Sequence, residues 1–337
     1  MPVVYLTTPG CRASLVSERI RVEFCAGNGT TEPPPPRDIH LHDVEHVVVD
    51  TRATITAAAM AECLRRRIPL VIVAGSTEVL GLCQPPSLHG RLRCAQYQRA
   101  CDPAFAVAIA VACVEAKIAN SRRVLQRLSS NRPGDGPAQT LAALEHLRIA
   151  ALAAGSVETL RGYEGTAAGR YYEALADYFP PAAPFERRSR RPPHNAVNAL
   201  LSYAYTLLVG EATAAIHASG LDGALGFLHE PDDGRPSLAL DLIEPLRAAV
   251  GDALALDLLN HSIINPAGHT EHRDGGVFLN TEGRRRFFTA YERRLERPFS
   301  SEQTGQRTTL RGEIARQVAS LKKSIVEGEP FEPFFMN

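Results

Sequence analysis

The spacing of apolar positions changes near residue 86 and divides the chain into two parts. Before this point, short alternating or β-branched runs are separated by Gly, Pro and Asn turns, a pattern that predicts strands. After it, apolar residues recur every three or four positions in segments rich in Ala, Leu and Arg, which predicts helices. We therefore expect an α+β fold, with a small β-rich N-terminal domain (1–86) and a larger all-α C-terminal domain (87–337). The predicted strands are Val3–Thr7, Ile20–Phe24, His46–Asp50 and Leu70–Val73.

One helix is expected inside the N-terminal domain, over Thr54–Arg67. Thr54 can cap its first turn, and three arginines at its end suit the negative end of the helix dipole. The Pro-rich run Glu32–Asp38 predicts a loop within the same domain, because strand-like segments flank it on both sides. In the C-terminal domain the predicted helices are 104–128, 138–154, 156–178, 195–219, 237–260, 281–296 and 307–326, followed by an irregular tail after Glu327.

Composition restricts the class of protein. Apolar residues make up 45% of the chain, enough for a substantial core. The sequence has neither a run of about 18 apolar residues nor a basic segment followed by an apolar one at its start, so we expect a cytoplasmic protein with no membrane partner. The seven cysteines form no C-x-x-C pair, which argues against a disulfide framework or a zinc ribbon.

Basic residues are clustered although the formal net charge is zero. The stretch Arg91–Arg132 contains eight basic and two acidic residues, and further clusters occupy 187–191, 284–297 and 307–323. Nearly all are arginines, whose planar guanidinium binds phosphate through two hydrogen bonds. The clusters therefore predict a polyanion partner, with solvated helix faces as the alternative for any single cluster.

A candidate metal site lies in residues 220–247. An apolar segment ends at His229, and Asp241 and Glu244 follow three positions apart, which puts both carboxylates on one face of the predicted helix. Hard cations such as Mg2+ and Mn2+ prefer oxygen ligands of this type. Pro245 lacks an N–H and predicts a kink there. The alternatives are a buried core histidine and an ordinary ion pair between the acids and Arg247.

A third acid, Glu164, lies in a helical segment between Gly162 and Gly165. Each glycine costs a helix up to about 1 kcal/mol relative to alanine, so the pair predicts close approach by a DNA strand or a facing helix. The alternative for Glu164 is an ion pair with Arg161, one turn earlier. Asp222 and Glu230 flank the site and need not belong to it.

A second His-containing cluster suggests zinc. It comprises His261, His269 and His272 with Glu271, and Asp257 precedes His261 by four positions. The surrounding turns predict a polar loop, and nothing in the sequence directs three ligands to one point. We therefore favour a DNA-facing or disordered loop over a zinc site.

Several motifs occur in the order seen in one protein family. They are Arg161–Tyr172, Asn195–Tyr205, Gly220–Asp222, Gly226–His229 and Leu240–Arg247. In these motifs, and in its β-rich start followed by a helical part, the chain resembles the CRISPR-associated spacer-acquisition endonuclease and integrase family. One departure is Gly223, where many members of the family have proline.

The resemblance implies the roles of four residues. By position, Glu164, His229 and Glu244 correspond to the metal ligands of the family, and Asp241 to a supporting acid within the catalytic set. It further implies Mg2+ or Mn2+ as cofactor, a homodimer joined through the β-rich domains, and the small second CRISPR adaptation protein as a partner. The implied reaction inserts short DNA fragments into a CRISPR array by attack of a 3′-hydroxyl on a repeat phosphodiester.

Two other functions remain open from the sequence. The same site could belong to a branched-DNA repair nuclease, or the acids could only form helix salt bridges in a DNA-binding scaffold without catalysis. On charge alone, the predicted DNA contacts are Arg122, Arg123, Arg190, Arg191, Arg285 and Arg293.

Overall fold

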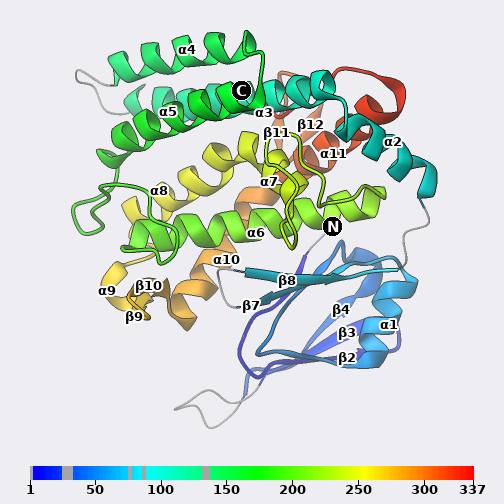
Figure 1. Cartoon of the computed structure of the whole chain (residues 1–337). Helices are drawn as coiled ribbons and strands as arrows, with labels where there is room; N and C mark the ends of the chain where they lie inside the picture. The colour runs from blue at the N-terminus through cyan, green and yellow to red at the C-terminus, as the bar shows by residue number, and fades with distance from the viewer. Residues whose placement is uncertain (1–2, 25–32, 75–77, 86–88, 131–136) are drawn as a thin grey trace. The chain divides into compact units, whose positions relative to one another are not determined.

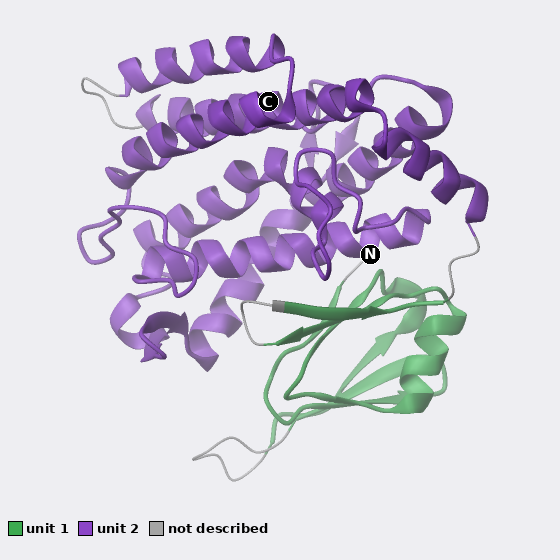
Figure 2. Ribbon diagram, viewed as in Figure 1, with its two compact units in different colours: residues 1–88 green, residues 89–337 purple. Residues whose placement is uncertain are grey.

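The computed structural model describes residues 3–24, 33–74, 78–85, 89–130 and 137–337. The chain forms two compact units, Met1–Leu88 and His89–Asn337, shown in different colours in Figure 2. The first is built mainly of strands and the second mainly of helices, which confirms the predicted α+β class. The predicted boundary lies two residues before the division between the units.

Two four-stranded sheets form the first unit (Figure 1). One has the order β1-β5-β7-β8, in which β8 is antiparallel to β7 and the other pairs are parallel. The other has the order β4-β3-β2-β6, in which only the β2–β6 pair is parallel. The first sheet comprises β1 (Val4–Leu6), β5 (Val47–Asp50), β7 (Leu70–Ala74) and β8 (Glu78–Cys83); the second comprises β4 (Arg37–His40), β3 (Arg19–Glu23), β2 (Arg12–Val16) and β6 (Thr54–Ile55).

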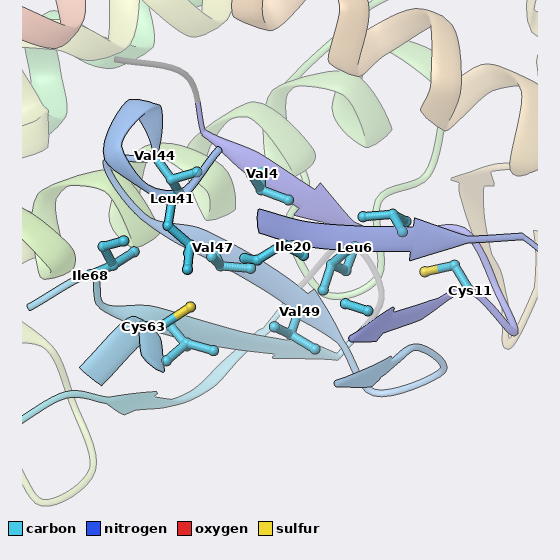
Figure 3. Close-up of a cluster of buried hydrophobic side chains, with 13 residues drawn as sticks. Val4, Leu6, Cys11, Ile20, Leu41, Val44, Val47, Val49, Cys63 and Ile68 are labelled. Carbon is cyan, nitrogen blue, oxygen red and sulfur yellow. The ribbon is translucent and has the colours of Figure 1, made fainter. Parts of the chain in front are cut away.

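The core of the first unit draws on both sheets and on helix α1 (Ala57–Arg65), as Figure 3 shows. Leu6 and Val47 from one sheet, Ile20 from the other and Cys63 from α1 are fully buried in it. Burial raises the pKa of the Cys63 thiol to about 11, so this cysteine serves as a small apolar side chain. The predicted N-cap at Thr54 is wrong, because Thr54 belongs to strand β6 and lies opposite Arg12 of β2. Thr56 caps α1 instead, and its side chain accepts from Ala59 N.

Four strands, β2, β4, β6 and β8, were not predicted. The predicted loop Glu32–Asp38 is partly wrong for the same reason: Arg37 and Asp38 belong to β4, and residues 25–32 lie outside the described part of the chain. Asp38 pairs with Arg21 of β3 through two hydrogen bonds of 2.8 and 2.9 Å. A polar edge strand of this kind depends on its neighbour, so its own sequence carries little strand signal.

Long helices dominate the second unit, and each predicted helical segment contains a helix, although the segment predicted over 307–326 begins with strand β12 and its helix starts only at Leu310. The most buried is α6 (Ala196–Ser219), which Asn195 caps through its side chain and which ends at Gly220 in the left-handed conformation. By length and composition α3 and α6 could each cross a membrane, but 72% of the apolar window of α6 is buried within the protein. The other main helices are α2 (Gly90–Ala100), α3 (Pro103–Ser130), α4 (Ala138–Leu152), α5 (Val157–Ala176), α10 (Thr281–Glu296) and α11 (Leu310–Glu327).

The segment predicted as one helix over 237–260 changes its winding three times. Helix α7 (Ser237–Ile243) leads into a 3₁₀ turn, η2 (Glu244–Leu246), a π-helical turn, η3 (Ala248–Asp252), and helix α8 (Ala253–Asn260). Pro245 lacks the N–H that an α-helix would use at this point, in agreement with the predicted kink. Glu244 therefore begins an irregular turn, directly after the helix that carries Asp241.

Two short hairpins depart from the expected all-α C-terminal domain. They are β9 (Thr270–Arg273) with β10 (Gly276–Leu279), and β11 (Phe299–Ser300) with β12 (Arg307–Thr308). Asp274 and Gly275 join the first pair with φ of 50° and 73°, as a tight hairpin turn requires. The segment expected to be a polar loop thus contains a short helix, α9 (Pro266–His269), and a hairpin.

Candidate functional site

Asp241 organises the segment that carries His229. Its carboxylate is fully buried and accepts from the backbone N–H groups of Phe227 (2.5 Å), Leu228 (3.0 Å) and His229 (2.9 Å). The same carboxylate lies 2.7 Å from Nδ1 of the His229 ring. A proton on Nδ1 leaves Nε2 as an electron-pair donor, the form in which histidine binds metals. Asp241 is therefore placed to orient His229.

Glycine is required at position 226, where the chain enters this turn. A Cβ there would collide with the backbone oxygen of His229 and would lie 3.0 Å from Oδ2 of Asp241. The Gly226–His229 motif therefore has a steric reason: the backbone must pass close to the Asp241 carboxylate.

Glu244 is almost fully buried and has basic neighbours on both carboxylate oxygens. Arg247 Nη2 lies 2.9 Å from Oε1, and Lys117 Nζ lies 2.6 Å from Oε2. His229 Nε2 is 4.0 Å from Oε1. Burial alone raises the pKa of Glu244, but Arg247 and Lys117 outweigh it and lower that pKa to about 2. Glu244 is thus held ionised.

Lys117 connects Glu244 to Glu164. It projects from α3, and its ammonium forms ion pairs with both Glu164 of α5 and Glu244. Burial alone lowers the pKa of Lys117, but the two carboxylates outweigh it and raise that pKa. In the sequence, Lys117 belongs only to a predicted basic cluster, with no expected role in the site. The available signal was its rarity, since the chain has three lysines among 37 basic residues and this one lies within an apolar helix.

The alternative ion pairs considered for these acids are only partly present. Arg161 does not pair with Glu164; it donates to the backbone oxygen of Leu228 at 3.1 and 2.9 Å and to Glu230 at 2.8 Å. It thereby supports the His229 segment. Arg247 does pair with Glu244, as the alternative expected, but in a buried setting. Asp222, the other flanking acid, accepts from the Tyr97 hydroxyl at 3.0 Å.

The donor chemistry suits a hard divalent cation. In the described part of the chain, no three His, Cys, Asp or Glu side chains form a group that could hold a metal ion as they stand. The ammonium of Lys117 instead pairs with the carboxylates of both Glu164 and Glu244, and His229 Nε2 lies 4.0 Å from the other oxygen of Glu244. A site already arranged around one cation, with two carboxylates and an imidazole, fits Mg2+ or Mn2+ once Lys117 moves aside.

A buried tyrosine–aspartate network adjoins the site. The hydroxyls of Tyr171 (2.9 Å) and Tyr205 donate to Asp252, and the Tyr172 and Tyr205 hydroxyls are 2.7 Å apart. Burial raises the pKa of Asp252 to about 6 despite these hydrogen bonds. Arg247 stacks on the Tyr205 ring at 4.6 Å and so joins the network to Glu244. A small cavity is lined by residues of both the network and the site: Lys117, Glu164, Tyr171, Tyr172, Arg247 and Asp252.

The glycines around Glu164 face open space. A Cβ added at Gly162 or Gly165 would meet no described atom within 4 Å. The expectation that a facing helix approaches here is therefore wrong for the described part of the chain. Close approach by a DNA strand remains a prediction.

The arginines predicted to bind DNA differ in their availability. Arg122 donates to the backbone oxygen of Leu141, and Arg123 to that of Asn337. Arg285 pairs with Glu282. By contrast, Arg190, Arg191 and Arg293 are exposed and have no hydrogen bond or ion pair to another described residue.

The suggested zinc cluster does not assemble. Nδ1 of His269 accepts from Asn265 N at 2.8 Å, and Nδ1 of His261 lies 2.9 Å from the backbone oxygen of Asp257. Glu271 and His272 lie on β9 and are exposed. Over the described ranges these side chains form no metal-holding group.

Known proteins with similar sequences carry CRISPR-associated functions. A Cas4/Cas1 exonuclease–endonuclease fusion of Geobacter sulfurreducens is 35% identical over 307 residues, covering 88% of this chain and 52% of that protein. A Cas1 endonuclease of Thermus thermophilus is 34% identical over 293 residues, covering 86% of each chain. The chain thus spans about half the length of the fusion protein.

The family profile described as CRISPR associated protein Cas1 matches residues 4–293. The match assigns the chain to a class of CRISPR-associated proteins whose curated members include endonucleases. The chain is a member of the Cas1 family.

Solved structures share the fold over the whole chain. A casposase bound to its integration product superposes with a TM-score of 0.85 at 24% identity, covering all of this chain and 95% of the casposase. A chain of a Cas6-RT-Cas1–Cas2 complex superposes with a TM-score of 0.80 at 23% identity, covering all of this chain and 36% of that one. At these identities the likeness shows the fold alone.

Proposed function

We propose that this protein is a metal-dependent DNA endonuclease and integrase that inserts short DNA fragments as spacers into a CRISPR array. The observation that carries the proposal is the cation of Lys117 held between Glu164 and Glu244, next to a histidine that Asp241 orients. Family membership and the endonuclease names of the relatives support it.

The residues that would hold Mg2+ or Mn2+ are Glu164, His229 and Glu244. When bound, such an ion supplies a Lewis acid for a phosphate oxygen. The chain's own groups prepare the site: Asp241 sets the ring orientation of His229, and Arg247 keeps Glu244 ionised. Gly162 and Gly165 leave the surface beside Glu164 open for a DNA strand.

The proposed reaction is a transesterification. The 3′-hydroxyl of the fragment loses its proton and forms a bond to a repeat phosphorus, and the bond from that phosphorus to the 3′-oxygen of the repeat strand breaks. The released 3′-oxygen takes up a proton and becomes a 3′-hydroxyl, so one phosphodiester bond forms as one breaks and their number is unchanged. Water in place of the fragment hydroxyl makes the same site an endonuclease.

The proposed partners are DNA, a second copy of this chain and the small second CRISPR adaptation protein. The Cas2 component named in the structurally similar complex supports the last. We place the homodimer contact on the β-rich unit, as in the family, and the protein in the cytoplasm.

Strand joining tests the proposal. The full chain, with and without the small partner, is incubated with 3′-hydroxyl fragments, a plasmid carrying a repeat array, and Mn2+ or Mg2+. We expect joined products that disappear when the fragment ends in a 3′-dideoxy nucleotide or when EDTA is added. Glu164→Ala and His229→Ala should abolish joining, whereas Glu158→Ala, an exposed acid on the same helix, should not.

The other outcomes identify the alternatives. Cutting of branched DNA without joining would indicate a repair nuclease that uses the same residues. DNA binding by the parent protein and by both site variants, with no product from any of them, would indicate a scaffold without catalysis.

A further inference from the structure

Two buried side-chain amides connect the Glu244 turn to the segment after α11. Asn120 lies on α3, one turn beyond Lys117, and Gln317 lies on α11. Both are almost completely shielded from solvent, with 1% and 0% of their surface exposed. Buried amides are costly unless their hydrogen bonds are made, so their partners indicate what they hold in place.

Asn120 uses both of its donors and its acceptor. Its Nδ2 donates to the backbone oxygens of Pro245 (2.6 Å) and Phe334 (2.8 Å), and its Oδ1 accepts from Met336 N at 2.7 Å. One side chain thus connects the residue after Glu244 with two residues near the end of the chain.

Gln317 makes the equivalent bridge on the other side of Glu244. Its Nε2 donates to the backbone oxygen of Leu242 at 3.3 Å, and its Oε1 accepts from Phe334 N at 2.9 Å. Both backbone polar groups of Phe334 are therefore bound to these two amides. Its phenyl ring is buried, with 2% exposed, and packs edge-on against Phe299 with ring centroids 6.3 Å apart.

The two carbonyls that receive these donors flank Glu244. Because Pro245 has no N–H and the chain passes from a 3₁₀ to a π-helical turn, the regular α-helical bonding is interrupted here, and only 3₁₀-type bonds such as Glu244 N–H to Asp241 O remain. Bonds from other helices then add to these local bonds in setting the position of the Glu244 backbone. The amides on α3 and α11 supply them on both sides, two residues before and one residue after the acid.

We propose that Asn120 and Gln317, with Phe334 bound between them, form a clamp that positions Glu244 for metal binding. This inference rests on the proposed metal-dependent function. Asn120 and Gln317 are positioning residues: they act on the metal site through the backbone of the Glu244 turn and contact neither metal nor DNA.

Metal affinity of the full chain tests the clamp. Free Mn2+ is measured by electron paramagnetic resonance during titration of the parent protein, Gln317→Met and Asn120→Leu, which remove the amides and keep similar volume. We expect the dissociation constant for Mn2+ to rise about tenfold in each, the usual scale for outer residues that orient metal ligands.

Gln96→Met is the matched control. Gln96 is also fully buried, and its amide makes two backbone hydrogen bonds, both to Asp222 on a different segment (2.9 and 2.8 Å). We expect its Mn2+ affinity to stay within about twofold of the parent value, although its melting temperature falls as in the test variants. Equal loss of affinity in all three variants would overturn the clamp, because general destabilisation would explain it.

Failure of the clamp differs from failure of the proposed function. If Mn2+ binds the parent protein and Glu164→Ala abolishes binding, but Gln317→Met and Asn120→Leu bind as tightly as the parent, the clamp alone is wrong. If the parent does not bind Mn2+, or binds it without Glu164, the metal site is wrong and the clamp fails with it. Since the amides lie on different helices, either variant decides the matter if the other does not fold.

Discussion

Nζ of Lys117 lies 2.6 Å from Oε2 of Glu244, and the same ammonium pairs with Glu164. Two acids from different helices are thereby held together by a cation of the protein itself. Without it, the buried carboxylate of Glu244 and the partly buried one of Glu164 would face each other, which is unfavourable. The relationship predicts competition between Lys117 and a bound metal for the same two ligands.

Lys117→Met should separate stability from metal affinity. Breaking a buried ion pair by removing one partner costs about 3 kcal/mol, so the melting temperature in EDTA should fall. Since the ammonium no longer competes, Mn2+ should raise the melting temperature more than it does in the parent protein. Thermal unfolding with EDTA and with Mn2+ measures both effects. Lys323→Met, at a position 60% exposed, should change neither, and equal Mn2+ gains in parent and Lys117→Met would contradict competition.

Asp241→Asn should impair joining through His229. An amide cannot accept the three backbone N–H groups and the His229 Nδ1 proton as the carboxylate does, so the ring loses its defined orientation. We expect the initial rate of strand joining to fall about 10- to 100-fold. Asp233→Asn, an exposed acid in the following loop, is the control and should retain the parent rate. A parent-like rate in Asp241→Asn would show that His229 does not need this support.

Asp252 should make stability depend on pH between about 4 and 6. The pKa of Asp252 in the folded state is about 6, above the ordinary value of 3.8, mainly because of burial, so the folded state retains the proton to higher pH than the unfolded chain. The stability that this raised pKa contributes is therefore fully present below pH 4 and is lost as pH rises to 6. A shift of this size corresponds to about 3 kcal/mol.

Asp252→Asn removes this titration and is the test. Urea titrations at pH 4, 5, 6 and 7 give the free energy of unfolding of both proteins. As pH rises from 4 to 6, the parent should lose stability relative to the variant, and above pH 6 the difference between them should stay constant. A difference between the two proteins that is independent of pH would show that Asp252 does not titrate in this range.

Gly165→Ala should increase stability and reduce joining. The added methyl meets no described atom and improves helix propensity, so the free energy of unfolding should rise by up to about 1 kcal/mol. If DNA passes beside Glu164, the methyl displaces it and slows joining by about tenfold or more. Gly169→Ala, also open but one helical turn farther from Glu164 along the same helix, should give the same stability gain with a smaller loss of joining. Faster or unchanged joining by Gly165→Ala would exclude DNA from this surface.

Arg190 and Arg191 should contribute to DNA affinity more than Arg122. The first two are exposed without a described partner, whereas Arg122 is bound to the Leu141 carbonyl. Each phosphate contact contributes about 0.9 to the slope of log affinity against log salt. The double change Arg190→Ala with Arg191→Ala should reduce the steepness of this slope by about 1.8, and Arg122→Ala should leave it nearly unchanged. Fluorescence anisotropy with a labelled duplex between 50 and 300 mM salt measures the slopes, and a larger loss for Arg122→Ala would reverse the assignment.

Local sequence determined much of the secondary structure of this protein. Apolar spacing predicts the starts of helices α5, α6 and α11 within a few residues, and in the structure Ser156, Asn195 and Thr309 cap them, each acting on its own first turn. The kink at Pro245 was predictable for the same reason, since a missing N–H is a local property. Strand β4 was not, because its polar residues are strand only when paired with β3.

The candidate site was likewise predictable in part: its residues could be identified from the sequence, but their partners could not. Its acids and histidine were identified by residue type, spacing and the family motifs that contain them. The partners of those residues depended on the tertiary structure: Lys117 and Glu164 are 47 positions apart, and Arg161 pairs away from Glu164 although it lies one helical turn from it. The sequence by itself thus determined the helices and the chemical character of the site. Only the folded chain decided which charges face one another, because ion pairs and buried amide bridges form between helices whose packing no local pattern specifies.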